Sequence, residues 1–323
     1  MVQSPDKQTI GMVSSYVGLN PCPADWLWLQ SPQPFGGWNG IQMLARSPRP
    51  DWLLLYQYSF PKPPAPGKLA FFRRPAPAAH PDLTTLLRGV PQERVIYLMR
   101  EPPLEEVVDK HQRIYQKAEK YCGYVSGPED FAPVPAYMPA IWYVGVSFRE
   151  LDTLPPPLKT RTCSWITSGI DRTENHRRRL AFLHQLQDTG LGIDFYGRDL
   201  PETVAAVGPV GNKWYAMAPY YYNLAIENYA DNGWYVSEKL WDALLAWCLP
   251  IYYGGPAADK LLPPESFLRL PSLDEKGIAY VQEIIASPDL WQARRGAIAE
   301  ARQIILHKLN LLNWLSEFVE RSA

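Results

Sequence analysis

Apolar positions in the second half of the chain occur in two alternating kinds of segment. Short apolar runs typical of buried strands lie at residues 162–166, 193–196, 220–226 and 251–253. Longer segments with apolar side chains at helical spacing lie between and after these runs, at residues 174–187, 237–247 and 278–285. Strands that alternate with helices in this way predict a parallel sheet with crossover helices.

The first half has a different pattern, because proline-rich connections separate its apolar runs. Candidate strands lie at residues 9–17, 52–58, 68–73 and 94–99, and a candidate helix lies at residues 104–120. The strands do not alternate strictly between apolar and polar positions. This pattern favours a sheet that is covered on both sides, as in doubly wound α/β folds.

Pro155, Pro156 and Pro157 interrupt the chain near its middle. Three consecutive prolines cannot continue a helix or a central strand, so we place an inter-domain linker here. The predicted organisation is one domain over residues 1–152, a second over 160–300, and a closing helix over 301–323 that continues a helical pattern from about residue 290. Two Rossmann-like domains joined in this way form a central cleft, where ligands bind at the carboxyl ends of the strands.

Composition and charge exclude several classes of function. The chain has 32 Lys and Arg against 33 Asp and Glu, which gives no electrostatic basis for a general nucleic-acid binder. Its four cysteines form no C-x-x-C pair, so a zinc site or disulfide framework is not expected and a reducing compartment fits best. The opening residues lack a signal-peptide pattern, and no apolar stretch reaches membrane-spanning length. We therefore expect a cytoplasmic protein without a transmembrane segment.

Several well-known catalytic motifs are missing from the sequence. It has no G-x-x-x-x-G-K-[ST] loop, no G-x-G-x-x-G after the first strand and no G-x-S-x-G nucleophile turn. It has no D-x-D pair that would hold a divalent metal against a nucleotide diphosphate, and its five histidines show no metal-ligand spacing. These absences argue against P-loop kinases, nicotinamide or flavin dehydrogenases, common hydrolases and a resident metal.

Residues 220–256 combine several features of an anion-binding site. The strand at 220–226 ends in Glu227 and Asn228, and Ser237 is placed to cap the helix that follows. Lys239 lies in the first turn of this helix, where a cation opposes the helix dipole. Either Glu238 compensates for it in a solvated pair, or the helix N-terminus and Lys239 together bind an anion.

This segment resembles the donor-binding motif of the α-1,3-fucosyltransferases (glycosyltransferase family 10), in their soluble bacterial form. The family pattern of F-E-N, then Y-V-T-E-K-L, then P-V-x-x-G is similar to residues 226–228 (IEN), 235–240 (YVSEKL) and 250–254 (PIYYG). Residues 266–270 (SFLRL) resemble the family's S-F-I-x-V segment, and residues 193–197 (IDFYG) resemble its V-D-V-Y-G strand end. The resemblance implies an α/β fold of the GT-B type and inverting transfer of fucose from GDP-fucose.

The resemblance continues more weakly on either side of these motifs. The arginine of the family's R-x-x-F/L-Y pattern is best matched by Arg179, although Arg177 and Arg178 adjoin it and remain alternatives. Gly169 stands where the family usually has an asparagine, after a strand similar to residues 164–168. In the N-terminal half, only residues 94–97 and 101–102 resemble the family, and they include Glu101.

The resemblance implies a role for each candidate residue. Glu101 would be the base that takes the acceptor proton, although the residues alone fit a partner of Arg100 equally well. Donor-binding residues would be Arg179, Asn228, Tyr235, Glu238 and Lys239. Within that set, the two cations would hold the diphosphate and Glu238 would hold the ribose hydroxyls. Further candidates are Arg178, Gly254 and Glu227, of which Glu227 fits a structural role better than a chemical one.

The implied partners are a nucleotide-sugar donor and an oligosaccharide or glycolipid-type acceptor. The family default is an acceptor that contains N-acetylglucosamine. No cofactor is implied, and Mn²⁺ or Mg²⁺ would act only as a stimulant. Two alternatives stay open, namely a transferase of the same fold that uses another nucleotide sugar, and a non-catalytic glycan-binding derivative. The oligomeric state is also open.

Overall fold

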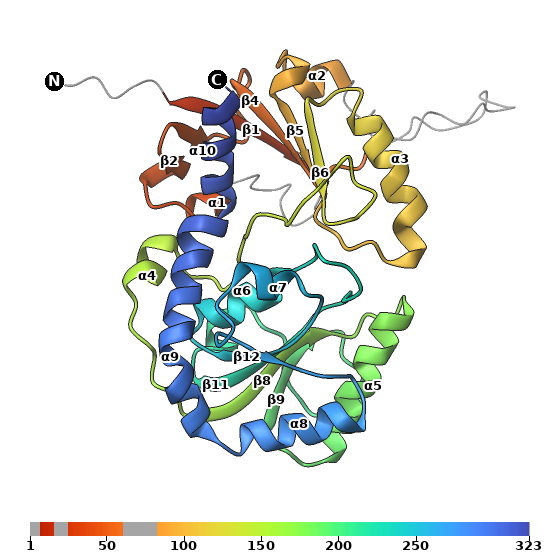
Figure 1. Ribbon diagram of the computed structural model, residues 1–323, viewed down its shortest axis with the longest axis vertical. Helices are drawn as coiled ribbons and strands as arrows, with labels where there is room; N and C mark the ends of the chain where they lie inside the picture. Colours follow the sequence, from red (N-terminus) through yellow and green to blue (C-terminus); the bar gives the residue numbers. More distant parts are fainter. Residues whose placement is uncertain (1–6, 16–24, 61–82, 323) are drawn as a thin grey trace, which may run out of the picture.

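The structure is a computed structural model that describes residues 7–15, 25–60 and 83–322 (Figure 1). Two β-sheets lie one above the other in this view, and the last helices of the chain run along both. The expected strand at residues 68–73 and the cysteine at position 22 lie outside the described residues.

The first sheet is formed by residues from the N-terminal half. Its strands are β1 (Gln8–Ser14), β2 (Gly37–Trp38), β3 (Ile41–Met43), β4 (Trp52–Tyr56), β5 (Val95–Leu98), β6 (Tyr124–Gly127) and β7 (Val134–Pro135). They lie in the order β2-β3-β1-β4-β5-β6-β7 and are parallel except for the antiparallel pair β2–β3. β4 and β5 are buried along their whole length, which confirms the prediction of a sheet covered on both sides.

Short helices accompany this sheet. They are α1 (Asp25–Trp28), α2 (Leu83–Leu87), α3 (Val108–Ala118) and α4 (Phe148–Thr153), together with the 3₁₀ turns η2 (Pro34–Gly36), η4 (Gln92–Arg94) and η5 (Glu105–Val107). α3, with η5 before it, corresponds to the expected helix at 104–120. Its buried Tyr115 and Ala118 belong to the same apolar cluster as residues of β4 and β5, so α3 covers one face of the sheet.

The second sheet is formed by the C-terminal half. Its strands are β8 (Arg161–Ser168), β9 (Ile193–Arg198), β10 (Ala206–Gly208), β11 (Tyr220–Ile226), β12 (Leu249–Tyr253) and β13 (Leu268–Arg269). All pairs are parallel, in the order β10-β9-β8-β11-β12-β13. The connecting helices are α5 (Glu174–Asp188), α6 (Glu238–Leu245), α7 (Ala257–Leu261) and α8 (Glu275–Ile285), with a 3₁₀ turn η6 (Lys213–Ala216). The predicted alternation of parallel strands and helices is confirmed.

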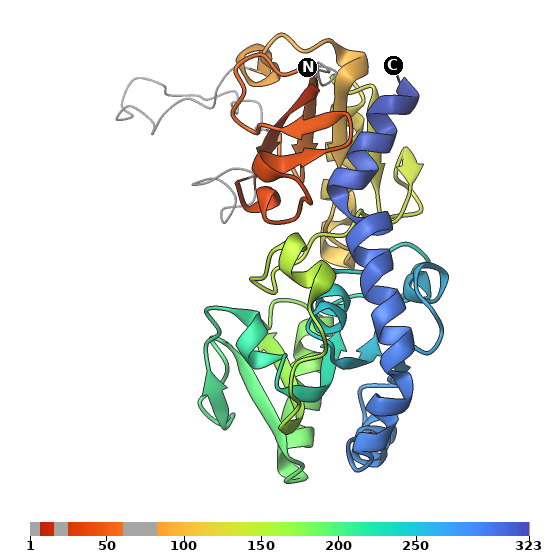
Figure 2. The same cartoon turned by 90° about the vertical axis from the view of Figure 1, so that its left-hand side faces the viewer.

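The C-terminal segment joins the two halves (Figure 2). α9 (Pro288–Gln303) packs on α6 and β11, and α10 (Leu311–Ser322) packs on β2 and β3. Where the sequence predicts one long helix, the structure has a π-helical segment, η7 (Ile304–Leu309), and a break at Asn310. The break coincides with a contact from a distant part of the chain, because Ala140 exchanges backbone hydrogen bonds with Leu309 and Leu311 on either side of it.

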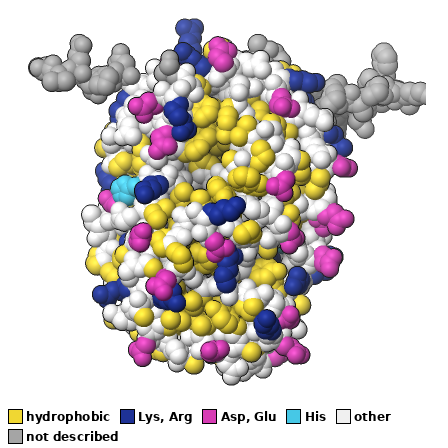
Figure 3. Space-filling model, in the orientation of Figure 1, with side chains coloured by type: hydrophobic (Ala, Val, Ile, Leu, Met, Phe, Trp, Pro, Cys, Tyr) yellow, Lys and Arg dark blue, Asp and Glu magenta, His cyan; other side chains and the backbone are white. Residues whose placement is uncertain are grey.

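The carboxyl ends of β5 and β11 face the same space. Arg100 follows β5, Glu238 begins the helix after β11, and their side chains meet at 2.5 Å. On the face in Figure 3, acidic and basic side chains are interspersed with apolar ones and no large area carries a single sign of charge. Among the helices of the described residues, none is long and apolar enough to cross a membrane.

Candidate functional site

A cavity of about 400 Å³ lies at the carboxyl ends of β8 and β9, beside the start of α6. Its lining residues are Ile166, Thr167, Ser168, Arg179, Gly197, Arg198, Val210, Lys213, Asn228, Glu238 and Lys239. Four of these side chains are cationic and only one is a carboxylate. The cavity is therefore suited to an anion, and it lies at the sheet edge where ligands bind in folds of this type.

Arg179 is the most deeply buried of the four cations. Its side chain is 4% exposed, Nη1 donates to Oδ1 of Asn228 at 2.6 Å, and Nη2 donates to the carbonyl of Ser168 at 2.9 Å. Burial lowers the pKa of Arg179 to about 10. Among the described residues no carboxylate lies within ion-pair distance of it, and its Nε has no hydrogen-bond partner. A buried cation with only neutral partners is a good receptor for an anion.

The N-terminus of α6 contributes Glu238 and Lys239 to the cavity lining. Ser237 caps the helix as predicted, because its Oγ accepts a hydrogen bond from the backbone N–H of Lys239 at 3.4 Å. Glu227 is buried behind this turn and accepts from the N–H of Ser237 at 2.8 Å and from its Oγ at 2.6 Å. Nζ of Lys239 donates to Glu227 at 3.1 Å. Glu227 thus holds the helix start and its lysine in place, as its expected structural role requires.

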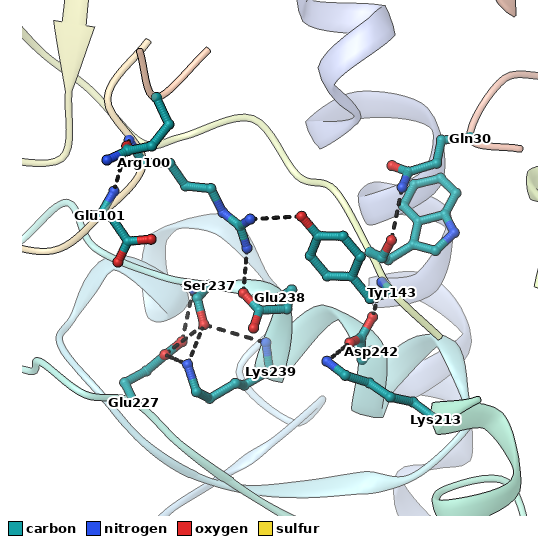
Figure 4. Close-up of polar contacts among 12 residues, drawn as sticks. Gln30, Arg100, Glu101, Tyr143, Lys213, Glu227, Ser237, Glu238, Lys239 and Asp242 are labelled. Carbon is teal, nitrogen blue, oxygen red and sulfur yellow. Dashed lines mark hydrogen bonds and ion pairs between the residues drawn. The ribbon is translucent and has the colours of Figure 1, made fainter. Parts of the chain in front are cut away.

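Glu238 links this helix to the N-terminal half (Figure 4). Its carboxylate pairs with the guanidinium of Arg100 at 2.5 Å, and the same guanidinium donates to the Tyr143 hydroxyl at 2.8 Å. Burial would raise the pKa of Glu238, but the charges of Lys239, Arg100 and Lys213 outweigh burial and hold this pKa well below its usual value. Glu238 is therefore a carboxylate at any physiological pH.

Lys213 forms a second ion pair beside Glu238. Its Nζ lies 2.6 Å from the carboxylate of Asp242, one turn along α6, and Asp242 is completely buried. Burial raises the pKa of Asp242, although Lys213 opposes this rise. Tyr143 completes the arrangement, because its backbone N–H donates to Asp242 at 2.7 Å.

Glu101 and Tyr235 lie near the Arg100–Glu238 pair rather than in the cavity lining. In Figure 4 the Glu101 side chain projects on the side of Arg100 where Ser237 lies. Burial raises the pKa of Tyr235, and the charges of Glu227, Glu101 and Glu238 raise it further. The charges of carboxylates from both halves of the chain therefore act on the Tyr235 phenol.

The three adjacent arginines differ in position. Arg177 and Arg178 are exposed, and only Arg179 lines the large cavity. Arg178 lines a separate polar cavity of about 40 Å³ together with Asn228 and Glu227. The sequence left the choice among these arginines open, and the geometry favours Arg179.

Gly254 does not line the cavity, and close packing around it leaves no room for a side chain. A Cβ at this position would clash with the Tyr252 phenol, and the Gly254 carbonyl accepts from Nη1 of Arg269 at 2.7 Å.

In the part of the chain that the structure describes, no cluster of three or more His, Cys, Asp or Glu could hold a metal ion.

Residues 156–289, which hold the whole cavity lining, match the model of the C-terminal domain of glycosyltransferase family 10 (fucosyltransferase). The C-terminal half of the chain is thus similar to the fucosyltransferase domain of glycosyltransferase family 10. The match confirms the resemblance seen in the residues 226–254 motifs.

Curated family members are similar over part of their length. The α-(1,3)-fucosyltransferase C of Drosophila melanogaster is 28% identical over 234 residues, which are 65% of this chain and 53% of that protein. A 4-galactosyl-N-acetylglucosaminide 3-α-L-fucosyltransferase of Gorilla gorilla gorilla is 31% identical over 138 residues, which are 40% of this chain and 36% of that protein. The matched segments thus span about half and about a third of these relatives.

Solved structures show the same fold at low sequence identity. A crystal structure of an α1,3-fucosyltransferase aligns with a TM-score of 0.56 and 16% identity, covering 100% of this chain and 91% of that one. A mutant T4 phage β-glucosyltransferase in complex with UDP-glucose aligns with a TM-score of 0.50 and 14% identity, covering 98% and 99%. This confirms the predicted GT-B-type fold of two Rossmann-like domains.

The family motif and the geometry coincide at four residues. Arg179, Asn228, Glu238 and Lys239 line one cavity although 60 positions separate the first from the last. Gly169 departs from the family pattern for a steric reason, because a side chain there would collide with the backbone carbonyl of Asp199. Sequence reasoning did not identify Lys213, Arg198 or the Arg100–Glu238 pair. For Arg100, its place beside Glu101 was the only available signal.

Proposed function

We propose that this protein is a fucosyltransferase that moves fucose from GDP-fucose to a hydroxyl of a glycan acceptor, with inversion at the transferred carbon. The observation that carries the proposal is Arg179, a buried cation with no carboxylate partner among the described residues, in a 400 Å³ cavity that Lys239 at the start of α6 also lines. The family assignment of residues 156–289 supports fucose as the sugar.

The donor would bind with its diphosphate on the cationic wall. Arg179 is suited to the phosphate oxygens because its fork can donate two parallel hydrogen bonds. Lys239 and the helix N-terminus would add positive charge where the leaving group develops negative charge. Glu238 keeps one carboxylate beside them, and its permanent charge suits it to accept hydrogen bonds from the ribose hydroxyls. Asn228 and Tyr235 would contact the diphosphate and the sugar.

The transfer would be a direct displacement. The acceptor oxygen bonds to the anomeric carbon as the bond from that carbon to the phosphate oxygen breaks, and the electron pair leaves with GDP. The proton of the acceptor hydroxyl would pass to Glu101, which approaches from the N-terminal half. Attack from the face opposite the leaving group inverts the configuration. A divalent cation, if it acts, would stimulate the reaction rather than form part of the site.

The acceptor and the location are part of the same proposal. The acceptor would be an oligosaccharide or glycolipid-type glycan, and the name of one matched relative, a 4-galactosyl-N-acetylglucosaminide 3-α-L-fucosyltransferase, supports N-acetylglucosamine within it. Cys122, Cys163 and Cys248 are free and buried, which supports a reducing, cytoplasmic location.

A transfer assay tests the proposal directly. Purified protein is incubated with GDP-fucose and a panel of glycans, with and without Mn²⁺, and products are identified by mass and by the configuration of the new bond. We expect a fucosylated glycan with inverted configuration and free GDP. Binding of a glycan without any transfer would instead support the non-catalytic derivative.

One observation favours a second candidate, a transferase for another nucleotide sugar. The backbone of Asp199 closes against Gly169 at the end of β8, where the family has an asparagine side chain. The cavity therefore differs from the family pattern beside Ser168. Transfer from GDP-mannose or a UDP-sugar in preference to GDP-fucose would support this candidate.

A further inference from the structure

The Arg100–Glu238 pair connects the two halves of the chain at the site. Arg100 follows the carboxyl end of β5, and Glu238 is the first residue of α6. The two side chains are only 11% and 19% exposed, so water screens the pair weakly. Loss of one partner would leave the other charge buried without its counter-ion, which is costly.

The backbone that carries Arg100 is fixed from the other side by Gln57. Gln57 follows β4 with a positive φ of 49°, and its Oε1 accepts from the N–H of Arg100 at 2.7 Å and from that of Glu101 at 3.2 Å. One side-chain oxygen therefore fixes both consecutive residues. The position of the Arg100 guanidinium is therefore coupled to that of the Glu101 carboxylate through the backbone of these two adjacent residues.

Two residues of the N-terminal half hold α6 at successive turns. Arg100 binds it through Glu238, and Tyr143 binds it through Asp242 at 2.7 Å. Tyr143 also connects the two contacts, because its hydroxyl accepts from Arg100 and its ring centroid lies 5.3 Å from the Arg100 guanidinium carbon. The start of α6 and the Glu101 stretch thus form one hydrogen-bonded unit (Figure 4).

We propose that Arg100 is a positioning residue, which sets the distance between Glu101 and a donor bound at the start of α6. The proposal rests on the proposed function, since it assigns Glu101 as the base and the α6 end as the donor site. In a displacement reaction the base must lie within hydrogen-bond reach of the acceptor hydroxyl, and small misplacements reduce the rate strongly. Arg100 itself contacts neither the acceptor nor the reacting atoms in this account.

The test separates turnover from donor binding in matched variants. Arg100→Met removes the charge and keeps a similar length, and Arg100→Lys keeps the charge but loses the fork that reaches Glu238 and Tyr143 together. Arg161→Met is the control, because it breaks an arginine–carboxylate pair with Asp194 of β9. Arg161 begins β8, whereas the cavity lies at the carboxyl end of that strand. Steady-state transfer, calorimetric binding of GDP and melting temperature are measured for each variant and for the wild type.

We expect Arg100→Met to lower kcat at least tenfold while GDP binds as tightly as before or more tightly, because the Glu238 carboxylate remains. Arg100→Lys should recover part of kcat, and Arg161→Met should stay within about twofold of wild type. If Arg100→Met does not fold, Arg100→Lys and Tyr143→Phe must still lower kcat without weakening GDP binding.

Two results would overturn the proposal alone. One is a kcat within twofold of wild type in the Arg100 variants, and the other is a parallel loss of kcat, GDP binding and melting temperature, which marks a structural role. A wild-type protein that transfers no sugar would instead overturn the proposed function on which this inference rests.

Discussion

The two halves of the chain present opposite chemistry to the space between them, and two arginines show the difference. Arg179 in the C-terminal half is buried with neutral hydrogen-bond acceptors, whereas Arg100 in the N-terminal half is paired with the carboxylate of Glu238. Arg179 can therefore still attract an anion, whereas the charge of Arg100 is largely neutralised by Glu238. The C-terminal half thus offers a cation to an anionic ligand, and the N-terminal half offers a cation that holds the Glu238 carboxylate in place.

The largest expected effect is the loss of the base from the N-terminal half. Glu101→Gln should lower kcat by about a hundred- to ten-thousandfold, because an amide cannot take the acceptor proton. GDP affinity should remain unchanged, since the donor contacts lie in the other half. Steady-state kinetics and calorimetry on the same sample measure both quantities.

Glu105→Gln is the matched control for this change. Glu105 is an exposed carboxylate in η5, four positions along the chain, and its variant should retain wild-type kcat. A Glu101→Gln variant with normal kcat would show that Glu101 of the N-terminal half is not the base.

The next effect is loss of the buried cation of the C-terminal half, Arg179. Arg179→Met should weaken GDP binding by about ten- to a hundredfold, because one charge-assisted contact contributes about 1.5–3 kcal/mol. Lys239→Met should have a similar or smaller effect, since its Nζ also bonds to Glu227. Calorimetric dissociation constants for GDP measure both.

The neighbouring arginines sharpen this prediction. Arg177→Met and Arg178→Met remove exposed charges from the same helix and should each weaken GDP binding less than Arg179→Met. If Arg178→Met has the larger effect, the diphosphate lies in the smaller cavity beside Asn228 rather than in the larger one.

A smaller effect concerns stability alone. Gly254→Ala should lower the free energy of unfolding by about 1–3 kcal/mol, because the new methyl group must displace the Tyr252 phenol. Activity per folded molecule should persist. Urea unfolding, followed by kinetics at a temperature where the variant is folded, tests whether this residue of the family motif acts through packing.

The smallest effect is a pH dependence of stability due to Glu238. Its pKa is lower in the folded state than its usual value of 4.5, so its contribution is complete above that pH and is lost as the pH falls below it. Arg100→Met removes one of the cations that lower this pKa. The fall in melting temperature as the pH is lowered from 4.5 to 2.5 should therefore be smaller in Arg100→Met than in wild type, and an equal fall would contradict the assignment.

Local patterns predicted the C-terminal half well. Ser237 as a helix cap and Glu227–Asn228 at a strand end are features of short, contiguous segments, and the structure confirms both. Contacts between distant positions were not predictable in this way. Arg100 and Glu238 lie 138 positions apart, and Lys213 occupies a 3₁₀ turn without any hydrophobic period around it. The break at Asn310 depends on Ala140, so the helical pattern of the C-terminal segment could not reveal it.

Binding of GDP-fucose through Arg179 in the cavity of the C-terminal half can be measured by calorimetric titration. Wild type and Arg179→Met are each titrated with GDP, GDP-fucose, GDP-mannose and a UDP-sugar, with and without Mn²⁺. Wild type should prefer GDP and GDP-fucose without needing metal, and Arg179→Met should lose most of this affinity. A preference for the uridine nucleotide, or equal GDP affinity in the two proteins, would contradict this expectation.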